Sequence, residues 1–591
     1  MSDPSVIESD LIMSGSPRGS RDGVLAVSSE NGKQGSEKLA EEITKRQIRL
    51  EHLRESHDAL WTDVDTYVTS RRARWNIGTQ KGAADDFPIG SEIYDGTSTA
   101  AIRDFVDQWQ AQTANAVVKW WGGRFRNAML RGMYSAKRWM DAVEEALSYE
   151  MANSNFYEQL NEAFADGTSH GVATMVGPEW DARRNKFYTL ERHPREVFIA
   201  TDWRGEVNLW HRKFVLTGRQ ILAQFGERPL TEKLVEQIRK NPYREYTIIH
   251  AIFERMERDI TSPLRSDLPW ASVWVMEKER IVLDEGGYTE METPQTWRWH
   301  SSASYPYGTC PAIDAIMDVL ASNSATKSLL YAAQLAVRPP VIQTENLGDF
   351  DLVPDGRIIL KNGATDKVQA FQYPTQFNIG VEQISALRND LKERFRANMG
   401  KMQSQLGGKI TAFQASLVQG EQAAASIPIT SRASDQLLVP MVNKFFHAAA
   451  KAGRIPAPPP EVMQYASSPV DIQMMGPMAV SAKRFLSQQG LAAFLGILEE
   501  IDKVMPGVGQ QIAKTVNGDE LRKFITDGDG TPNKIFFTDE QIAAMRQQEA
   551  QMVQAQQKQA ALGQMADMYN KATEAPQQGS PAQQLMGGQQ S

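Results

Sequence analysis

The sequence has 591 residues, of which 41% are hydrophobic, and this is enough for several structural units with apolar cores. Its 64 basic and 72 acidic residues leave a net charge of −8, which excludes a global basic field that attracts nucleic acid. The lone Cys310 excludes an internal disulfide and a cysteine zinc site and fits a reducing cytoplasm, and the sequence shows neither an apolar membrane span nor a secretion signal.

The N-terminal part of the chain is predicted to be a disordered arm followed by helices. Residues 1–35 are rich in Ser, Gly and charge and carry few large apolar groups, which is typical of disorder. An apolar stripe on one face predicts a helix from Ser36 to about Arg74. Further helices are predicted from Thr99 to about Val118 and from Trp139 to Ala165.

A β-rich part follows these helices. Strand signals occur at about 172–177, 186–191, 196–201, 206–216, 245–256, 271–276 and 279–283. Turn signals such as Asp202–Gly205 and Glu285–Gly287 separate the segments. Short helices are predicted from Thr217 to Phe225 and between Glu232 and Lys240. Strands mixed with short helices in this way predict an α+β domain.

The stretch from Tyr305 to Gly400 has the pattern of two helices that flank a compact insert. Pro311 suits the first turn of a long helix whose apolar residues recur every three or four positions, and Pro339-Pro340 ends it. The insert, Val341–Tyr373, contains Asp-Gly and Asn-Gly turn signals, and a second helix is predicted from Ile379 to Met399. The pattern indicates a stalk with a tip, while the periodicity alone fits a core helix of a monomeric domain equally well.

Downstream of the stalk the sequence predicts a flexible segment, several helices and one strand. These elements are a flexible segment from Gln403 to Gly420, a helix from Thr430 to Ala452, a strand from Val470 to Met474, a helical region from Gly476 to Met505, a helix from a capping box at Thr538 to about Asn570, and a disordered tail.

The sequence offers no convincing catalytic or nucleotide-binding motif. Gly407-Gly408-Lys409 lacks both the earlier glycine and the following Ser or Thr of a phosphate-binding loop. Asp527–Gly530 lacks the glycine that a calcium loop requires, so a turn is the better interpretation. No nucleophile elbow, zinc-protease helix or dinucleotide fingerprint occurs. We therefore expect a protein that is not an enzyme and that needs no cofactor and no metal.

Basic residues are concentrated along the second stalk helix and the segment after it. In a single copy the set is an ordinary mixed-charge helix face, because Asp390 and Glu393 lie among the cations. In a ring each cation is repeated, and such sparse positive rings contact DNA phosphates weakly and without reading the base sequence. Both interpretations stay open at this point. The set comprises Arg388, Lys392, Arg394, Arg396, Lys401 and Lys409.

An ordered series of short segments resembles the head-to-tail connector (portal) proteins of short-tailed double-stranded DNA phages. No single segment is diagnostic, but the series, spread over roughly residues 40–550, is fairly specific. The segments are Ile93-Tyr94-Asp95, Ser154-Asn155-Phe156, Leu216–Gln220 before Phe225-Gly226, Tyr307-Gly308 with Pro311, Pro339-Pro340 and Gly476–Ala479.

The resemblance implies a portal-type α+β fold with an α/β wing, a two-helix stem, a small β-containing clip and a helical crown, assembled as a ring. The parts it implies are a disordered arm (1–35), the wing (36–304), the first stem helix (305–340), the clip (341–375), the second stem helix (376–400), the tunnel loop (401–428), a wing return helix and strand (429–475), the crown (476–570) and a disordered tail (571–591).

The resemblance also implies a function. Such proteins form a ring, expected to be a dodecamer, at one capsid vertex, through which DNA is packaged and ejected. The implied partners are duplex DNA, the terminase large subunit, tail adaptor or tube proteins, and the major capsid and scaffolding proteins, with no membrane. The implied location is the portal vertex of the virion after assembly in the host cytoplasm.

Two sets of residues are the candidate sites under this interpretation. Lys401, Lys409, Lys392 and Arg396 are expected to face DNA in the tunnel loop and stem. Residues at the turns of the clip are expected to dock the terminase and the tail, namely Asp355, Arg357, Lys361 and Asn362.

Two rival functions remain at this point. A shell or scaffold-associated capsid protein is also a cysteine-poor assembler, but it should lack the helix–insert–helix stalk. A nuclease or peptidase needs a convergent active site, which the sequence does not display.

Overall fold

The computed structural model describes the helical and β-rich body of the chain in detail. The described residues are 30–69, 93–302 without 257, 260, 261 and 263, 305–337, 341–342, 369–370, 377–397, 423–463, 470–481, 552 and 562–563. The chain divides into two compact units, residues 1–495 and 496–591, and nearly all described residues belong to the first.

Helices and strands are both abundant, which confirms the predicted α+β class. The helices are α2 (Glu30–Tyr67), α4 (Thr97–Thr113), α5 (Ala128–Gly132), α6 (Tyr134–Asn153), α7 (Phe156–His170), α8 (Gly218–Phe225), α9 (Glu232–Lys240), α10 (Pro311–Asp314), α11 (Ile316–Val337), α12 (Phe377–Arg394), α15 (Ile427–Ala433), α16 (Val439–Lys451) and α17 (Pro460–Met463). Single turns of other helix types are the 3₁₀ segments η2 (Arg265–Asp267) and η3 (Glu290–Glu292) and the π segment η5 (Ser434–Leu438).

The strands lie mainly in the middle of the sequence. They are β1 (Trp121–Phe125), β2 (Val172–Asp181), β3 (Lys186–Arg192), β4 (Val197–Thr201), β5 (Val207–Thr217), β6 (Glu245–Glu254), β7 (Trp270–Met276), β8 (Ile281–Tyr288), β9 (Gln295–Arg298), β10 (His300–Ser302), β11 (Tyr305–Thr309), β12 (Val341–Ile342), β13 (Gln369–Ala370) and β14 (Val470–Met474). The seven predicted strand segments correspond to β2 through β8.

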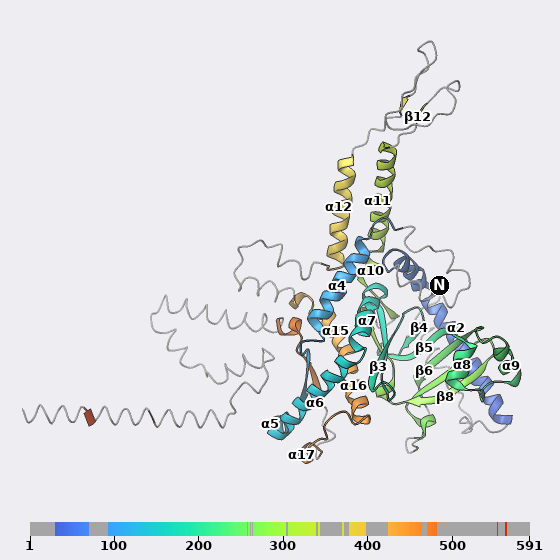
Figure 1. The fold of residues 1–591 in the computed structure, drawn as a ribbon, viewed down its shortest axis with the longest axis vertical. Helices are drawn as coiled ribbons and strands as arrows, with labels where there is room; N and C mark the ends of the chain where they lie inside the picture. The colour runs from blue at the N-terminus through green and yellow to red at the C-terminus, as the bar shows by residue number, and fades with distance from the viewer. Residues whose placement is uncertain are drawn as a thin grey trace, which may run out of the picture. The chain divides into compact units, whose positions relative to one another are not determined.

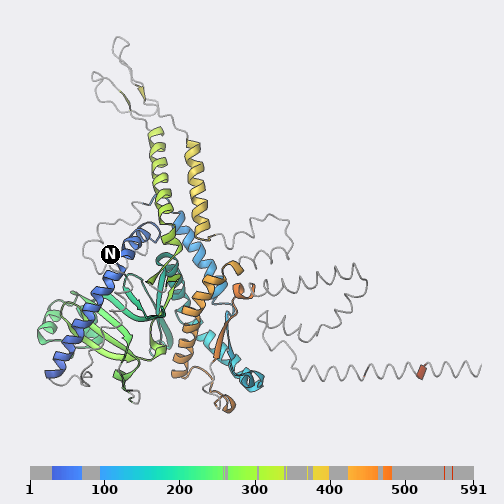
Figure 2. The same cartoon turned by 180° about the vertical axis from the view of Figure 1, so that it is seen from behind.

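The largest sheet is a five-stranded antiparallel meander in the order β4-β5-β6-β7-β8 (Figure 1). Helix α2 crosses one face of it, and Figure 2 shows the same helix from behind. Ala40 and Ile43 pack on a patch that includes Ile249 and Val273, while Leu50 packs further along α2 against β4 and β5. Burial of this apolar stripe on the sheet holds the long helix in place.

Two predicted short helices lie between β5 and β6. Thr217 begins α8 with a capping box, because its side chain accepts the Gln220 N–H and the Gln220 side chain accepts the Thr217 N–H. Ile221, Leu234 and Ile238 of α8 and α9 form a small apolar core with residues of the sheet. The predicted helices at 217–225 and 232–240 are therefore confirmed.

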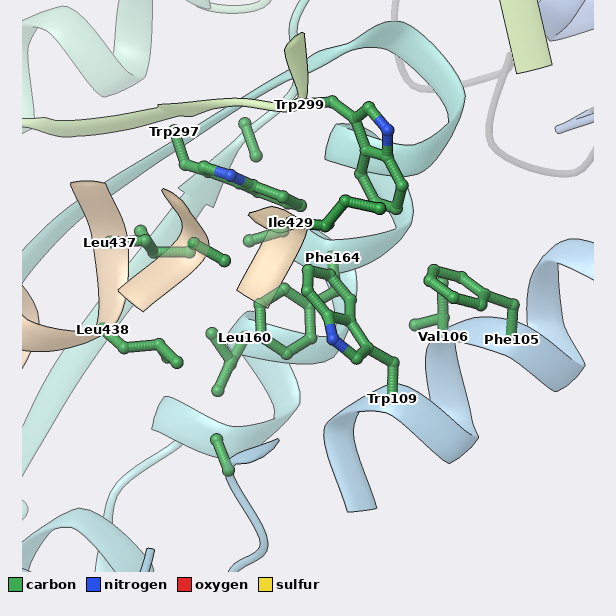
Figure 3. Packing of buried hydrophobic residues seen from close by; sticks show 14 of the residues in the cluster. Phe105, Val106, Trp109, Leu160, Phe164, Trp297, Trp299, Ile429, Leu437 and Leu438 are labelled. Atoms are coloured by element: carbon green, nitrogen blue, oxygen red, sulfur yellow. The ribbon is translucent and has the colours of Figure 1, made fainter. Parts of the chain in front are cut away.

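The main core lies between α4, α7, the three-stranded sheet β3-β2-β9 and the helices after residue 427 (Figure 3). Trp109 of α4 packs on Phe164 of α7 with ring centroids 4.5 Å apart and on Trp297 of β9 at 5.4 Å. Gly167 faces the Trp297 ring so closely that an added Cβ would lie 2.1 Å from it. This position therefore has no room for a side chain.

Several predicted helix boundaries were wrong. Helix α2 begins at Glu30 and ends at Tyr67, so Ser36 is not its cap and it does not reach Arg74. Helix α4 ends at Thr113 rather than at Val118, because the chain then turns into β1 to bury Trp120 and Trp121. Strand β1 was not predicted, and it pairs with β14.

Two of the predicted continuous helices are interrupted. The helical region 139–165 is split into α6 and α7 at Ser154, whose Oγ accepts the Phe156 N–H at 3.1 Å. The long helix after Pro311 is split at Ala315 into α10 and α11. The helix predicted from Thr430 to Ala452 runs instead from Ile427 to Lys451, with a π turn inside it.

Candidate functional site

Helices α11 and α12 lie side by side and extend away from the sheets (Figures 1 and 2). Gly380 of α12 faces Leu329 of α11, and an added Cβ would lie 3.4 Å from the Leu329 side chain, at ordinary van der Waals contact. Ile384 and Leu391 of α12 are buried. Where the helices end, β12 pairs with β13 in antiparallel register, so the two ends of the predicted insert meet. The helix–insert–helix pattern is therefore present at its described ends.

A loop before α4 joins the base of both helices. The Asn323 side-chain oxygen of α11 accepts the backbone N–H of Tyr94 at 2.7 Å and that of Asp95 at 3.1 Å. Asp95 Oδ2 accepts the Ser322 hydroxyl of α11 and lies 3.3 Å from the Arg388 Nε of α12. One carboxylate thus contacts α11 and α12 at the start of α4.

Hydrogen bonds and a nearby cation stabilise the negative charge of Asp95, although its side chain is only 5% exposed. Its Oδ1 also accepts the Thr97 N–H at 3.1 Å and the Thr97 hydroxyl at 2.6 Å. Burial by itself raises the pKa of Asp95, but the hydrogen bonds from Ser322 and Thr97 and the charge of Arg388 outweigh it, so the pKa lies below its ordinary value. Asp95 is therefore an ionised buried group that fixes this junction.

The C-terminal end of α12 has an unusual residue in its cap. The Arg396 N–H donates to Glu393 O and the Ala397 N–H donates to Lys392 O, which is the Schellman pattern of helix ends. Arg396 has the left-handed φ of 53° that this pattern usually assigns to glycine. Ala397 and Phe395 are buried, whereas the Arg396 side chain is exposed. The cap therefore directs a cation into solvent at some cost in backbone strain.

Two of the predicted DNA-facing residues can be placed. Lys392 and Arg396 are both exposed, one on the last turn of α12 and the other in its cap. Lys401 and Lys409 lie outside the described residues. The predicted docking residues Asp355, Arg357, Lys361 and Asn362 also lie outside them.

The faces of the helix pair that turn away from each other carry apolar side chains. Met317 and Tyr331 of α11 are 72% and 63% exposed, and Val381 of α12 is 51% exposed. Beside them on α11 lie small residues such as Ala321 and Ser324. Exposed apolar and small side chains along a helix are typical of a face that packs against another helix.

One cluster in the described residues has the spacing of a metal site. It comprises Asp65 of α2, His170 of α7 and His193, with potential ligand atoms within 4.8 Å of one another. Asp65 Oδ1 lies 2.9 Å from His170 Nε2, and its Oδ2 accepts the Arg195 Nε–H at 2.6 Å. His193 Nδ1 accepts the backbone N–H of Arg195 at 3.3 Å.

These contacts fit a buried ion pair better than a metal centre. A metal on His193 Nε2 requires a proton on Nδ1, and that proton would face the Arg195 N–H. The Arg195 guanidinium already donates a hydrogen bond to one oxygen of Asp65, which is the only carboxylate of the cluster. Burial raises the pKa of Asp65, but His170 and Arg195 outweigh burial and hold it far below its ordinary range. The cluster ties α2 to α7 and to the β3–β4 connection.

The contacts at the helix base were not predicted from the sequence. Asp95 lies in one of the segments of the family resemblance and Arg388 in the basic set of the second stalk helix, but the contact between them spans 293 positions of sequence. Ser322 and Asn323 are polar residues in the middle of a helix that is otherwise largely apolar. Their polarity at the middle of that helix was the available signal. Among helices in the described residues, none combines the length and the apolar character that a membrane crossing requires.

Comparisons with known proteins give matches that extend over most of the chain. The sequence model of the family described as bacteriophage head to tail connecting protein matches residues 40–536. The chain is 24% identical over 535 residues to the probable portal protein of Bordetella phage BPP-1, covering 89% of this chain and 93% of that protein. It is 20% identical over 551 residues to the portal protein of Salmonella phage epsilon15, covering 92% and 96%.

Proposed function

The chain belongs to the bacteriophage head-to-tail connecting proteins, and on this premise we propose that copies of it form the ring through which double-stranded DNA enters and leaves the capsid. The protein is a phage portal protein and a component of the virion, with a structural rather than an enzymatic role. The ring is proposed to contain twelve copies and to assemble in the host cytoplasm.

The parts of the chain are assigned by the proposed portal organisation. Residues 36–304 are the wing, 305–340 and 376–400 the two stem helices, and 341–375 the clip. The assignment of the stem is supported by α11 and α12, and that of the clip by the pairing of β12 with β13 between them. The tunnel loop (401–428), the wing return (429–475) and the crown (476–570) complete the proposal.

The stem helices are proposed to make the contacts that close the ring. A ring of identical chains needs a heterologous contact, in which one surface of each copy meets a different surface of the next. The outward face of α11, with exposed Met317 and Tyr331, would bury its apolar groups against α12 of the neighbour. The free face of α12 carries Glu382 and Glu393, which complement the exposed Lys327 of α11. This exposed face is the observation that carries the ring proposal.

A pair of substitutions tests that face. Met317→Asp with Tyr331→Asp would place two charges in the proposed contact, so we expect monomers or small oligomers where the native protein gives rings. Tyr243→Asp is the control, because Tyr243 is 73% exposed but lies in the β-rich part near α9. Particle masses of all three proteins would be compared. Native-size rings from the stem variant would contradict the proposal.

DNA is proposed to pass Lys392 and Arg396 on the stem and Lys401 and Lys409 in the tunnel loop. Sparse cations let phosphates be contacted without a base sequence being read, and the acidic balance of the chain avoids trapping the polyanion. Replacing Lys401 and Lys409 with Ala should leave ring assembly unchanged and alter DNA packaging or retention. If the length and stability of the packaged DNA did not change, the assignment of these lysines would be wrong.

The clip is proposed to dock the terminase large subunit first and tail adaptor or tube proteins later, through Asp355, Arg357, Lys361 and Asn362. The wing and its surroundings are proposed to meet major capsid and scaffolding proteins. Deleting residues 341–373 should leave rings intact while motor and tail docking are lost, since the proposal assigns this insert to the tip of the stem. Loss of the rings themselves would count against this placement.

A further inference from the structure

A short stretch after α4 is basic in an otherwise acidic chain. Residues 119–140 contain six lysines and arginines and no aspartate or glutamate, whereas the whole chain has a net charge of −8. The stretch forms β1, α5 and the beginning of α6. We call it the basic lobe. Such a local concentration of one charge sign is typical of a surface for a polyanion.

The basic lobe is folded around its own small core. Phe125, Leu130, Ala136 and Met140 bury their side chains together with Val462 of α17. Strand β1 pairs along its whole length with β14. The cations are therefore presented from a packed scaffold and not from a loose loop.

Most cations of the lobe are not used for internal ion pairs. Lys119 pairs with the buried Glu144, and Arg126 pairs with Asp471 at 2.7 Å. The other four make no ion pair with any part of the chain that the structure describes, and these are Arg124, Arg131, Lys137 and Arg138. Arg124, Lys137 and Arg138 are exposed.

The surroundings of Asp471 show that the arginines gather on one surface. The hydrogen bond from Arg126 lowers the pKa of Asp471 most, and the charges of Arg124 and Arg131 lower it further. One exposed carboxylate thus faces three guanidinium groups. The excess positive charge is left for a ligand.

Two of the cations lie near the beginning of α6. Lys137 and Arg138 are the fourth and fifth residues of this helix, whose first turn has no acidic residue and no side-chain cap. The N-terminus of a helix carries partial positive charge. An anion at this end of α6 would therefore be attracted by the helix terminus and by both side chains together.

The same surface exposes apolar groups beside the charges. Met129 is 61% exposed, Tyr134 is 71% exposed, and Met463 of α17 is 59% exposed. Ser135 next to Tyr134 donates to Glu461 of α17, so these groups lie near one another. Aromatic and methionine side chains among arginines are enriched in contact surfaces.

The position of the lobe separates it from the proposed channel contacts. Figure 1 shows α5 and α17 at the opposite end of the described body from α11 and α12. The DNA-facing residues Lys392 and Arg396 belong to α12 and its cap. The lobe is therefore a second basic surface, separate from the cations of α12 and its cap.

We propose that the basic lobe binds the phosphate backbone of duplex DNA outside the channel, so that the ring holds DNA at a second surface. The identification of the polyanion as DNA rests on the proposed portal function, while the binding of a polyanion does not. The contacts would be with phosphates alone, since the cations lie on short elements and no long helix or ribbon is offered to a groove.

The experiment uses preassembled rings of the full chain and a covalently closed circular duplex. A closed circle cannot thread a closed ring, so its binding reports on the outer surface only. The test variant is Arg124→Ala/Lys137→Ala/Arg138→Ala. The control is Arg228→Ala/Lys233→Ala/Lys278→Ala, which removes the same charge from exposed positions near α8, α9 and the β7–β8 turn.

We expect the circle to bind native rings and the control, and to bind the test variant at least about tenfold more weakly at 0.1 M salt. The slope of log affinity against log salt should fall by up to about 2.7, because each phosphate contact contributes about 0.9. Equal binding by test and control variants would overturn the proposal. So would equal affinity for polyglutamate, which would indicate an acidic protein as the partner.

The experiment distinguishes a failure of the second DNA surface from a failure of the portal proposal. Rings that fail to bind the closed circle but still support DNA packaging would refute the second surface and leave the channel intact. Circular dichroism and particle mass of the test variant establish that its rings are folded. Its altered side chains are exposed, so we expect both to be unchanged.

Discussion

Removing the Asp95 carboxylate should loosen the base of the stem selectively. In Asp95→Ala the Ser322 hydroxyl, the Thr97 hydroxyl and the Thr97 N–H lose their shared acceptor, and Arg388 loses its counter-charge. Ser322 is 1% exposed, so water does not replace the lost partner easily. The change leaves the apolar contacts of α11 and α12 in place.

The magnitude follows from the bonds that are lost. A hydrogen bond to a charged group contributes about 1.5–3 kcal/mol, and the Ser322 and Thr97 hydroxyl bonds together correspond to about 3 kcal/mol of local stability. The matched comparison is Asp318→Ala, which breaks the pair with Arg394 across the same two helices. Its partners are 54% and 36% exposed, so that pair contributes at most about 1 kcal/mol.

Hydrogen exchange of assembled rings at pH 7 measures the difference. A loss of about 3 kcal/mol should speed the exchange of backbone amide hydrogens about 100-fold, both at the start of α4 and in the N-terminal half of α11. Asp318→Ala should speed it less than about fivefold. The Asp95 contribution is present above the ordinary carboxyl pKa and is lost as pH falls through the lowered folded value, so the two variants should converge in acid. Equal exchange in both variants at pH 7 would refute the reasoning.

Three further predictions concern single titratable or strained residues. Burial lowers the pKa of Lys444 to about 8, so between pH 8 and 10.5 the unfolded chain holds a proton that the folded chain has lost, and stability should rise by about 3 kcal/mol. Denaturant midpoints of Lys444→Met should lack this rise, and a rise that persists would assign it to other groups. Burial lowers the pKa of His250, stacked on Trp274, to about 3, so stability should fall by about 4 kcal/mol as pH drops from 6.5 towards 3. His250→Phe should weaken that acid loss in thermal scans, and an unchanged acid profile would show that His250 does not cause it. Arg396→Gly should slow exchange of the Ala397 N–H about fivefold by relieving about 1 kcal/mol of strain, and faster exchange would contradict the strain assigned to this cap.

Local patterns made much of the fold predictable. The segments that became β2 to β8 alternate or concentrate β-branched and aromatic residues, and Thr217 with Gln220 marks the start of α8. The two stem helices were recognisable because their apolar spacing and the two prolines are local signals. The strand order of the large sheet follows the sequence order, which keeps its pairing local as well.

Features that depend on distant partners were not predictable. Strand β1 contains two glycines and little alternation, and its partner β14 lies about 350 positions later. Ser154 looks like an ordinary helical residue, and only the structure shows that its hydroxyl accepts the Phe156 N–H between α6 and α7. Asp95 shows no sign in its own segment that it will meet Ser322 and Arg388, because only the folded chain brings them together. Candidate cations could be identified by charge, but not by the direction in which they point.

Imaging of the purified protein expressed alone, combined with particle mass, tests the central claim most directly. We predict rings of about twelve copies around a central hole wide enough for duplex DNA. Rings that differ by one subunit would agree with the claim, since heterologous contacts can close at neighbouring numbers. A homogeneous monomer, or closed shells without a central hole, would contradict it.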